Sequence, residues 1–250
     1  MHEPRSTEHG LLRDAPRRIL VYGHGDESDA NRINTLASFA QARSAGADGV
    51  ELDLRRTADD QLVVIHDPQL PDGRRIEATP RAELPEDIPL LEDVLDLCLG
   101  MRVNLEIKNY PRDPAFDASQ RVTALTLDLL ERRGFSDQVI VSCFDFGCID
   151  HVRARNAQQS TAMLYLSRRD PALLLDAVVR HGHSSVYPYD TMVDANFMRL
   201  AQARGLEVNV WLEVAEEQRL RELVALNVDG LITSEIALAQ RVARESNAST

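Results

Sequence analysis

The sequence predicts an α/β protein of the (β/α)8 TIM-barrel type, and three observations support that prediction. Short apolar runs rich in β-branched residues alternate with longer helical patterns along the chain. Counting the first run, the alternation gives about eight strand–helix units, the number that closes a barrel. No glycine fingerprint for a dinucleotide phosphate follows the first run, which makes an open doubly wound sheet the weaker alternative.

The first half of the chain supplies three barrel strands and one excursion. In order, we expect a strand at Ile19–Tyr22, a turn-rich loop over Gly23–Arg32, a helix at Thr35–Ser44 capped by Asn34, a strand at Gly49–Leu54, a ribbon-like run at Leu62–Ile65, a short insertion over about residues 67–88, a helix at Leu90–Leu99 and a strand at Val103–Ile107. The insertion follows the second strand and is rich in proline and charge.

The second half repeats the same alternation five times. The expected strands are Val139–Ser142, Thr161–Leu166, Ser185–Tyr187, Glu207–Leu212 and Gly230–Thr233. The expected helices are Ser119–Arg133, Phe146–Arg155, Pro171–Arg180, Asp194–Arg204, Ala215–Leu226 and Ile236–Arg244. No linker or low-complexity tract interrupts residues 17–246, so we expect one domain there, with loose tails at 1–16 and 247–250.

Composition excludes several classes of protein. The chain has 250 residues and a net charge of −12, so it carries no basic footprint for nucleic acid. No apolar run approaches the ~18 residues of a membrane span, and the first residues contain no signal-peptide core. Cys98, Cys143 and Cys148 are dispersed and odd in number, which favours buried thiols over a disulfide framework or a zinc site. We therefore expect a cytoplasmic protein; its oligomeric state does not follow from the sequence.

Three carboxylates stand on the second and third strands. Because side chains alternate along a strand, Glu51 and Asp53 point the same way, and Glu106 occupies the equivalent face of the next strand. Carboxylates inside an apolar barrel are costly unless something neutralises them, and a hard divalent cation is the simplest partner. Lys108 shares the face of Glu106 and lies one step nearer the carboxyl end, where a cation suits a phosphate oxygen.

Two histidines follow strands close to these carboxylates. His24 comes directly after the first strand, and His66 ends the Leu62–Ile65 run with Asp67 beside it. Two histidines near a metal are what general acid–base cleavage of an ester needs. The other histidines receive no role; they lie in the tail, on helices or in a helix-end loop, at His2, His9, His151, His181 and His183.

An ordered set of motifs resembles the glycerophosphodiester phosphodiesterase family. The resemblance extends from about Ile19 to Leu238. Its clearest blocks are residues 34–39, 46–59, 64–68, 88–95, 104–108, 141–145, 208–211 and 228–233. The resemblance implies a TIM-type barrel that hydrolyses glycerophosphodiesters to glycerol 3-phosphate and an alcohol. It further implies that His24 and His66 form the acid–base pair and that Mg²⁺ or Ca²⁺ is held by Glu51, Asp53 and Glu106. Lys108 would contact phosphate, and Trp211 on the seventh strand would line the pocket.

The chain departs from the family pattern at the barrel mouth. Where the family has His-Arg-Gly, this chain has His24, Gly25 and Asp26, and where the family has Glu-Asn-Thr the first residue is Ile33. The arginine that would grip phosphate is therefore missing, and the candidate replacements are Arg32, Arg55 and Arg56. Two alternatives stay open: a weakly active or inactive member that binds a phosphodiester or related ligand, and a phospholipase D-type phosphodiesterase.

Overall fold

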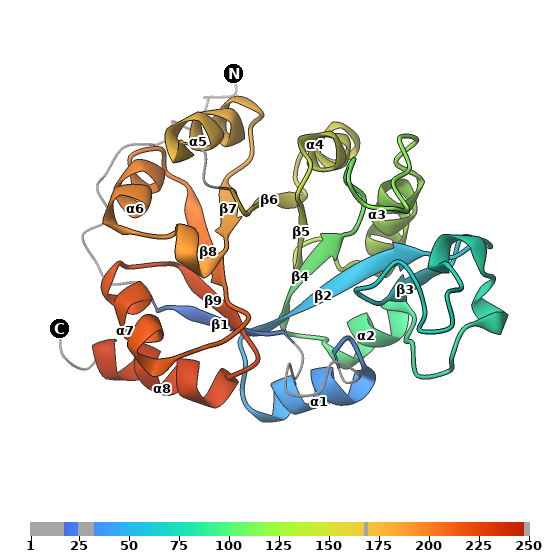
Figure 1. The fold of residues 1–250 in the computed structure, drawn as a ribbon, viewed down its shortest axis with the longest axis horizontal. Helices are drawn as coiled ribbons and strands as arrows, with labels where there is room; N and C mark the ends of the chain where they lie inside the picture. Colours follow the sequence, from blue (N-terminus) through green and yellow to red (C-terminus); the bar gives the residue numbers. More distant parts are fainter. Residues whose placement is uncertain (1–17, 25–32, 168–169, 248–250) are drawn as a thin grey trace, which may run out of the picture.

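The strands form one sheet that closes on itself, as the ring of helices around converging strands shows (Figure 1). The computed structural model describes residues 18–24, 33–167 and 170–247. The strand order is β1-β9-β8-β7-β6-β5-β4-β2-β3, and an additional pairing of β1 with β2 closes the ring. Every pairing within the ring is parallel. The predicted (β/α)8 TIM barrel is therefore confirmed.

Each strand of the ring is followed by a helix. The strands are β1 (Leu20–Gly23), β2 (Gly49–Arg56), β3 (Leu62–Val64), β4 (Arg102–Ile107), β5 (Val139–Cys143), β6 (Ser160–Tyr165), β7 (Ser185–Pro188), β8 (Glu207–Trp211) and β9 (Gly230–Thr233). The helices are α1 (Leu36–Ser44), α2 (Leu91–Leu97), α3 (Arg121–Arg133), α4 (Phe146–Arg155), α5 (Pro171–Arg180), α6 (Ala195–Gln202), α7 (Glu217–Ala225) and α8 (Ile236–Asn247). No helix of the described segments is long and apolar enough to cross a membrane.

The excursion after β2 is a ribbon with a small core of its own. β3 pairs antiparallel with the end of β2, from Leu54 opposite Val64 to Arg56 opposite Leu62. This pairing explains why β2 extends two residues past the predicted end, because the ribbon continues its hydrogen-bond ladder beyond the barrel. The insertion then folds through two short 3₁₀ turns over a buried cluster of Val63, Leu70, Ile76, Leu84 and Ile88.

The first strand closes the barrel between the second and the last. Gly23 pairs with Val50 on one side and with Thr233 on the other. Gly49 allows the close approach of β1, since a Cβ there would lie 2.6 Å from the ring of Tyr22 and from the Arg102 carbonyl. The pairing of β1 with β9 also holds His24, the residue after β1, because the His24 N–H donates to the Thr233 carbonyl at 3.2 Å.

The main core lies between the strands and the surrounding helices, and a second cluster fills the barrel lumen. The lumen cluster consists of Tyr22, Ala162, Leu164, Tyr187 and Ile232. The three cysteines are buried free thiols, as their spacing predicted. At the carboxyl ends of the strands the lumen lining becomes polar, and this is where barrel enzymes place their sites.

Candidate active site

Alternation along β2 and the register of β4 bring three carboxylates together. Asp53 lies directly opposite Glu106, and Glu51 lies opposite Asn104. Glu51, Asp53 and Glu106 are 5%, 1% and 6% exposed, and one oxygen from each lies within 4.8 Å of the others. Their shared face and shared strand ends therefore gather the three residues that the sequence singled out.

Among the residues that the structure describes, Lys108 is the permanently charged cation that contacts these carboxylates. Its Nζ lies 2.9 Å from Asp53 Oδ1 and 2.6 Å from Glu106 Oε1, and the residue is 9% exposed. Burial alone would raise the pKa of Asp53, but Lys108 and then the two histidines outweigh it and hold that pKa low. Burial raises the pKa of Glu106 to about 7 despite Lys108, because Asp53 and Glu51 add to the effect. One ammonium thus leaves the cluster with excess negative charge, which a divalent cation fits.

His24 follows β1 and His66 follows β3, and both of these strands pair with the edge of β2 that faces away from β4. His24 Nδ1 contacts Glu51 Oε2, and its side chain is 26% exposed. His66 Nδ1 lies 2.8 Å from Asp67 Oδ1, and its side chain is 60% exposed. His66 is held near the cluster because the N–H of the preceding Ile65 donates to the Asp53 carbonyl at 2.9 Å. Both imidazoles act on the pKa of Asp53, so both lie near it.

Asn34 has a different position from the one expected. The helix cap is Thr35, which forms a capping box with Ser38, and Asn34 lies before it with φ of 61°. Asn34 Nδ2 donates to Asp53 Oδ2 at 2.8 Å, and Asn34 Oδ1 accepts from the Asp53 N–H at 3.1 Å. The expected cap is therefore wrong, because the amide grips the carboxylate instead. Thr35 with Ser38 three residues later was the available sequence signal.

Arg55 does not replace the missing phosphate-gripping arginine. Its guanidinium makes a bidentate pair with Asp113 at 3.0 and 2.8 Å, and its Nε donates to the His66 carbonyl at 2.8 Å. Arg56 pairs with Asp60 at 2.9 Å. Gly25, Asp26 and Arg32 lie outside the described residues, and Ile33 is half-buried. Arg55 instead fixes the backbone beneath His66, a role that the sequence did not reveal.

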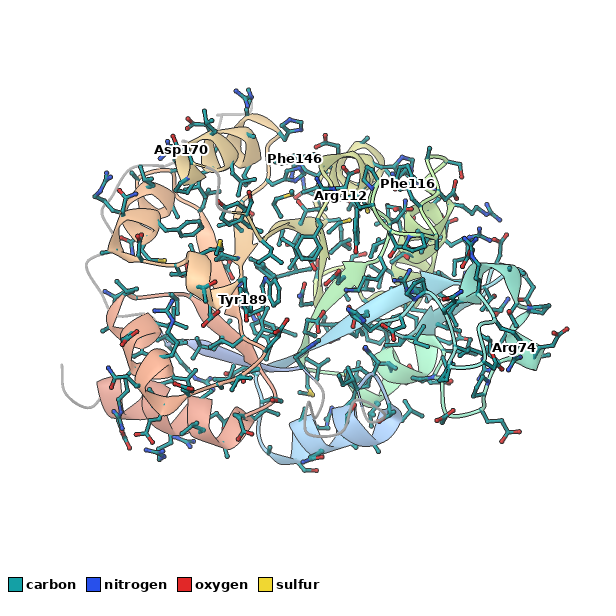
Figure 2. The ribbon with its side chains drawn as sticks, in the orientation of Figure 1. Arg74, Arg112, Phe116, Phe146, Asp170 and Tyr189 are labelled. Carbon is teal, nitrogen blue, oxygen red and sulfur yellow. The ribbon has the colours of Figure 1, made fainter. Side chains whose placement is uncertain are left out.

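A row of aromatic rings lies at the barrel mouth, drawn from the end of β8 and from the segments that follow β4, β5 and β7. Trp211, at the end of β8, donates from Nε1 to the Tyr187 carbonyl at 3.1 Å. Its ring lies 4.5 Å from that of Tyr189 and 6.3 Å, edge-on, from that of Phe144, whose other neighbour is Tyr110 at 5.8 Å. Figure 2 shows Tyr189 on the inner side of the helix ring. The sequence identified only Trp211, because the other rings come from separate loops and strand ends.

The chain is similar over most of its length to known phosphodiesterases. Residues 25–238 match the model of the glycerophosphoryl diester phosphodiesterase family. A glycerophosphodiester phosphodiesterase of Caldanaerobacter subterraneus is 25% identical over 247 residues, covering 87% of this chain and 95% of that relative. A probable glycerophosphodiester phosphodiesterase 2 of Mycobacterium tuberculosis is 26% identical, with 90% of each chain covered.

Solved structures show the same fold. A putative glycerophosphoryl diester phosphodiesterase from Silicibacter pomeroyi superposes with a TM-score of 0.82 at 24% identity, covering 94% of this chain and 96% of that one. An Oleispira antarctica phosphodiesterase, solved in complex with the product sn-glycerol-3-phosphate, superposes with a TM-score of 0.80 at 20% identity. The match covers 90% of this chain and 96% of that one. The curated relatives are named glycerophosphodiester phosphodiesterases, a class of phosphoric diester hydrolase. On the strength of the family match over residues 25–238, this chain belongs to the glycerophosphoryl diester phosphodiesterase family.

Proposed function

We propose that the protein hydrolyses a small glycerophosphodiester to glycerol 3-phosphate and an alcohol, with Mg²⁺ or Ca²⁺ held by Glu51, Asp53 and Glu106. The observation that carries the proposal is the buried carboxylate cluster facing a single ammonium. Its all-oxygen donor set suits a hard cation. When bound, such a cation would neutralise phosphate oxygens and make phosphorus more electrophilic. The relatives' names and the product-bound neighbour support the choice of substrate class.

The two histidines supply the proton transfers. One takes a proton from the attacking hydroxyl, of water or of the neighbouring glycerol carbon, as the new P–O bond forms. The other gives a proton to the leaving alcohol oxygen as the old P–O bond breaks. His24 Nδ1 contacts Glu51, and His66 Nδ1 contacts Asp67, so each ring is oriented by a carboxylate through Nδ1. We assign the proton transfer to Nε2 of each ring, the nitrogen that does not contact this carboxylate.

The remaining side chains bind and orient the substrate. Lys108 would contact a phosphate oxygen, and its ammonium beside Asp53 and Glu106 supports this role because it lies next to the proposed metal site. Trp211 and the rings beside it offer an apolar wall for the glycerol or the leaving group. Arg55 holds the backbone of His66 and acts as a positioning residue.

A direct assay tests this function. The protein is incubated with glycerophosphodiesters and Mg²⁺, Ca²⁺ or Mn²⁺, and glycerol 3-phosphate release is followed. We expect activity in the wild type, and losses of at least about 100-fold in Glu51→Gln and His66→Ala. His151→Ala, a half-buried histidine on α4, is the matched control and should keep full activity. Equal inactivity of the wild type and both site variants, across all metals and substrates, would contradict the proposal.

A second candidate is a family member that binds the diester but turns it over slowly. The observation in its favour is that Arg55 is committed to Asp113, while Gly25 and Ile33 stand where the family has charged residues. Gly25→Arg separates the two candidates. A large gain in kcat with unchanged product affinity would favour this second candidate, a family member that is slow because it lacks the arginine. No gain in kcat would favour the first candidate, an active enzyme that does not need an arginine at position 25.

A further inference from the structure

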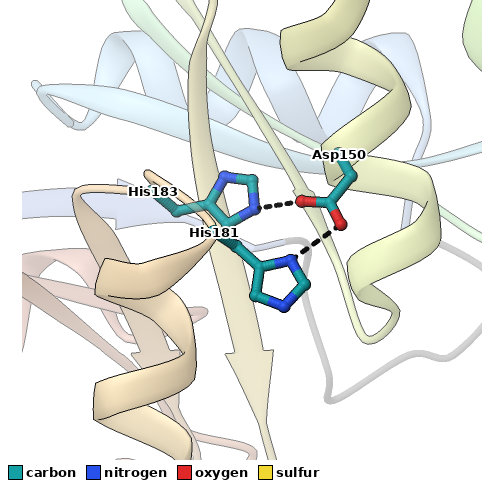
Figure 3. Close-up of side chains that lie close together, drawn as sticks. All are labelled: Asp150, His181 and His183. Carbon is teal, nitrogen blue, oxygen red and sulfur yellow. Dashed lines mark hydrogen bonds and ion pairs between the residues drawn. The ribbon is translucent and has the colours of Figure 1, made fainter.

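A second group of metal-ligand side chains lies on the outside of the barrel, between α4 and the turn that joins α5 to β7. Asp150 comes from α4, and His181 and His183 come from the turn (Figure 3). His181 Nδ1 lies 2.8 Å from Asp150 Oδ2, and His183 Nε2 lies 3.0 Å from Asp150 Oδ1. A ligand atom from each of the three lies within 4.8 Å of the others. His183 precedes β7, so the group lies toward the barrel end opposite the proposed active site.

The turn that carries the histidines has a defined geometry. α5 ends in a Schellman motif, in which the His183 N–H donates to the Val178 carbonyl at 3.0 Å and the Gly182 N–H donates to the Val179 carbonyl at 2.9 Å. Gly182 adopts φ of +81°, and this reversal presents the side chains on both sides of it to α4. The two imidazoles are nearly parallel, with centroids 6.3 Å apart, and Phe146 stacks against both. The ligand atoms are therefore held before any ion arrives.

A buried hydroxyl supplies the outer support that metal-bound histidines usually have. Thr161 Oγ1 lies 2.8 Å from His183 Nδ1, and the His183 side chain is fully buried. With an ion bound, Nδ1 would carry the proton and donate to Thr161, and the Nε2 lone pair would coordinate the ion in place of the hydrogen bond to Asp150. Such a partner fixes the tautomer and ring orientation of a ligating histidine.

We propose that Asp150, His181 and His183 form a binding site for a transition-metal ion such as Zn²⁺. Zinc holds its ligands at ~2.0–2.1 Å, so neighbouring tetrahedral ligand atoms stand about 3.3 Å apart. One ligand atom from each residue already lies within 4.8 Å of the others, so small side-chain shifts would bring them to that spacing. Two imidazoles and one carboxylate select Zn²⁺, Co²⁺, Ni²⁺ or Cu²⁺ over Mg²⁺ and Ca²⁺. The side chains of Asp150 and His181 are 40% and 37% exposed, so an ion can enter and water can complete its coordination. The ion would join α4 to the start of β7.

Metal titration of the full-length, metal-free protein tests the site. Co²⁺ binding is followed by its visible absorption, and Zn²⁺ binding by the rise in Tm. His181→Ala should weaken binding at this site by at least about 100-fold, and Thr161→Val should weaken it by about 10- to 100-fold. His151→Ala, on the same helix but outside the group, should match the wild type. The readouts do not depend on diester hydrolysis, so this proposal and the proposed function can fail separately.

One further variant separates metal binding from simple hydrogen bonding. His181→Gln keeps an amide N–H for Asp150 but removes the imidazole ligand, so it should lose Co²⁺ binding at this site while the metal-free protein stays folded. Absence of imidazole-type Co²⁺ absorption in the wild type overturns the proposal. The same affinity and spectrum in wild type, His181→Ala and His181→Gln also overturns it.

Discussion

Replacing Asn34 tests how the carboxylate cluster is held. Asn34 is 5% exposed, makes two hydrogen bonds to Asp53 and adopts φ of 61°. The bond to the carboxylate contributes roughly 1.5–3 kcal/mol and the bond from the backbone N–H about 1 kcal/mol. An alanine in the left-handed region costs roughly 1 kcal/mol more. Asn34→Ala should therefore lower the free energy of unfolding by about 3–5 kcal/mol. Asn34→Gly, which escapes the backbone cost, should lose about 1 kcal/mol less.

The same substitution should weaken metal binding. Asp53 loses the amide that orients its Oδ2, and losing such a support typically costs about 10- to 100-fold in metal affinity. Urea unfolding measures the stability change, and calorimetric titration with Mg²⁺ and Ca²⁺ measures the affinity. Asn227→Ala is the matched control, because Asn227 also has a positive φ, of 58°, but lies exposed on the turn after α7. Our reasoning is wrong if Asn34→Ala unfolds within about 1 kcal/mol of the wild type and binds metal equally well.

Three further predictions follow from contacts outside the cluster. Asp113→Asn leaves the guanidinium of Arg55 buried without its carboxylate, so calorimetry should show that the free energy of unfolding falls by about 3–5 kcal/mol, or roughly 6–20 °C in Tm. The double variant Asp113→Asn with Arg55→Met should recover most of that stability. The pKa of Glu217 is lowered from 4.5 to about 2 by hydrogen bonds from Arg241 and a second arginine, so its contribution to stability is present above pH 4.5 and is lost toward pH 2. The Tm difference between wild type and Glu217→Gln should shrink over that range; a constant difference would contradict it. Trp211→Ala should raise KM for the diester by about 10-fold with metal affinity unchanged, and Trp211→Phe should recover most of the loss.

Local periodicity predicted the part of the site that consecutive strands carry. Glu51 and Asp53 are two residues apart on one strand, so their shared direction follows from strand geometry alone. Glu106 lies on the strand that comes next in the ring, and the parallel register then sets it opposite Asp53. No folding detail beyond strand order was needed to bring these three together.

Contacts made through turns and loops could not be predicted in the same way. Arg55 and Asp113 are 58 residues apart, and Asp150 and His183 are 33 apart. Their meeting depends on where the loop after β4 and the turn after α5 place side chains, and periodicity does not report this. The prediction that Asn34 caps the helix was wrong for a related reason. Its left-handed backbone directs the side-chain amide to Asp53 rather than to the helix.

The pairing of β1 with β9 has a consequence for how the protein is made. His24 is held through the Thr233 carbonyl, and β1 gains its second neighbour only when β9 is in place. On the ribosome, the carboxylates of β2 and β4 emerge before β9, which is translated after every other strand of the barrel. A nascent chain that stops before β9 would carry the acidic cluster and His66 but would lack the Thr233 carbonyl that holds His24. Translation of β9 would thus be the step that completes the seating of His24 beside the cluster.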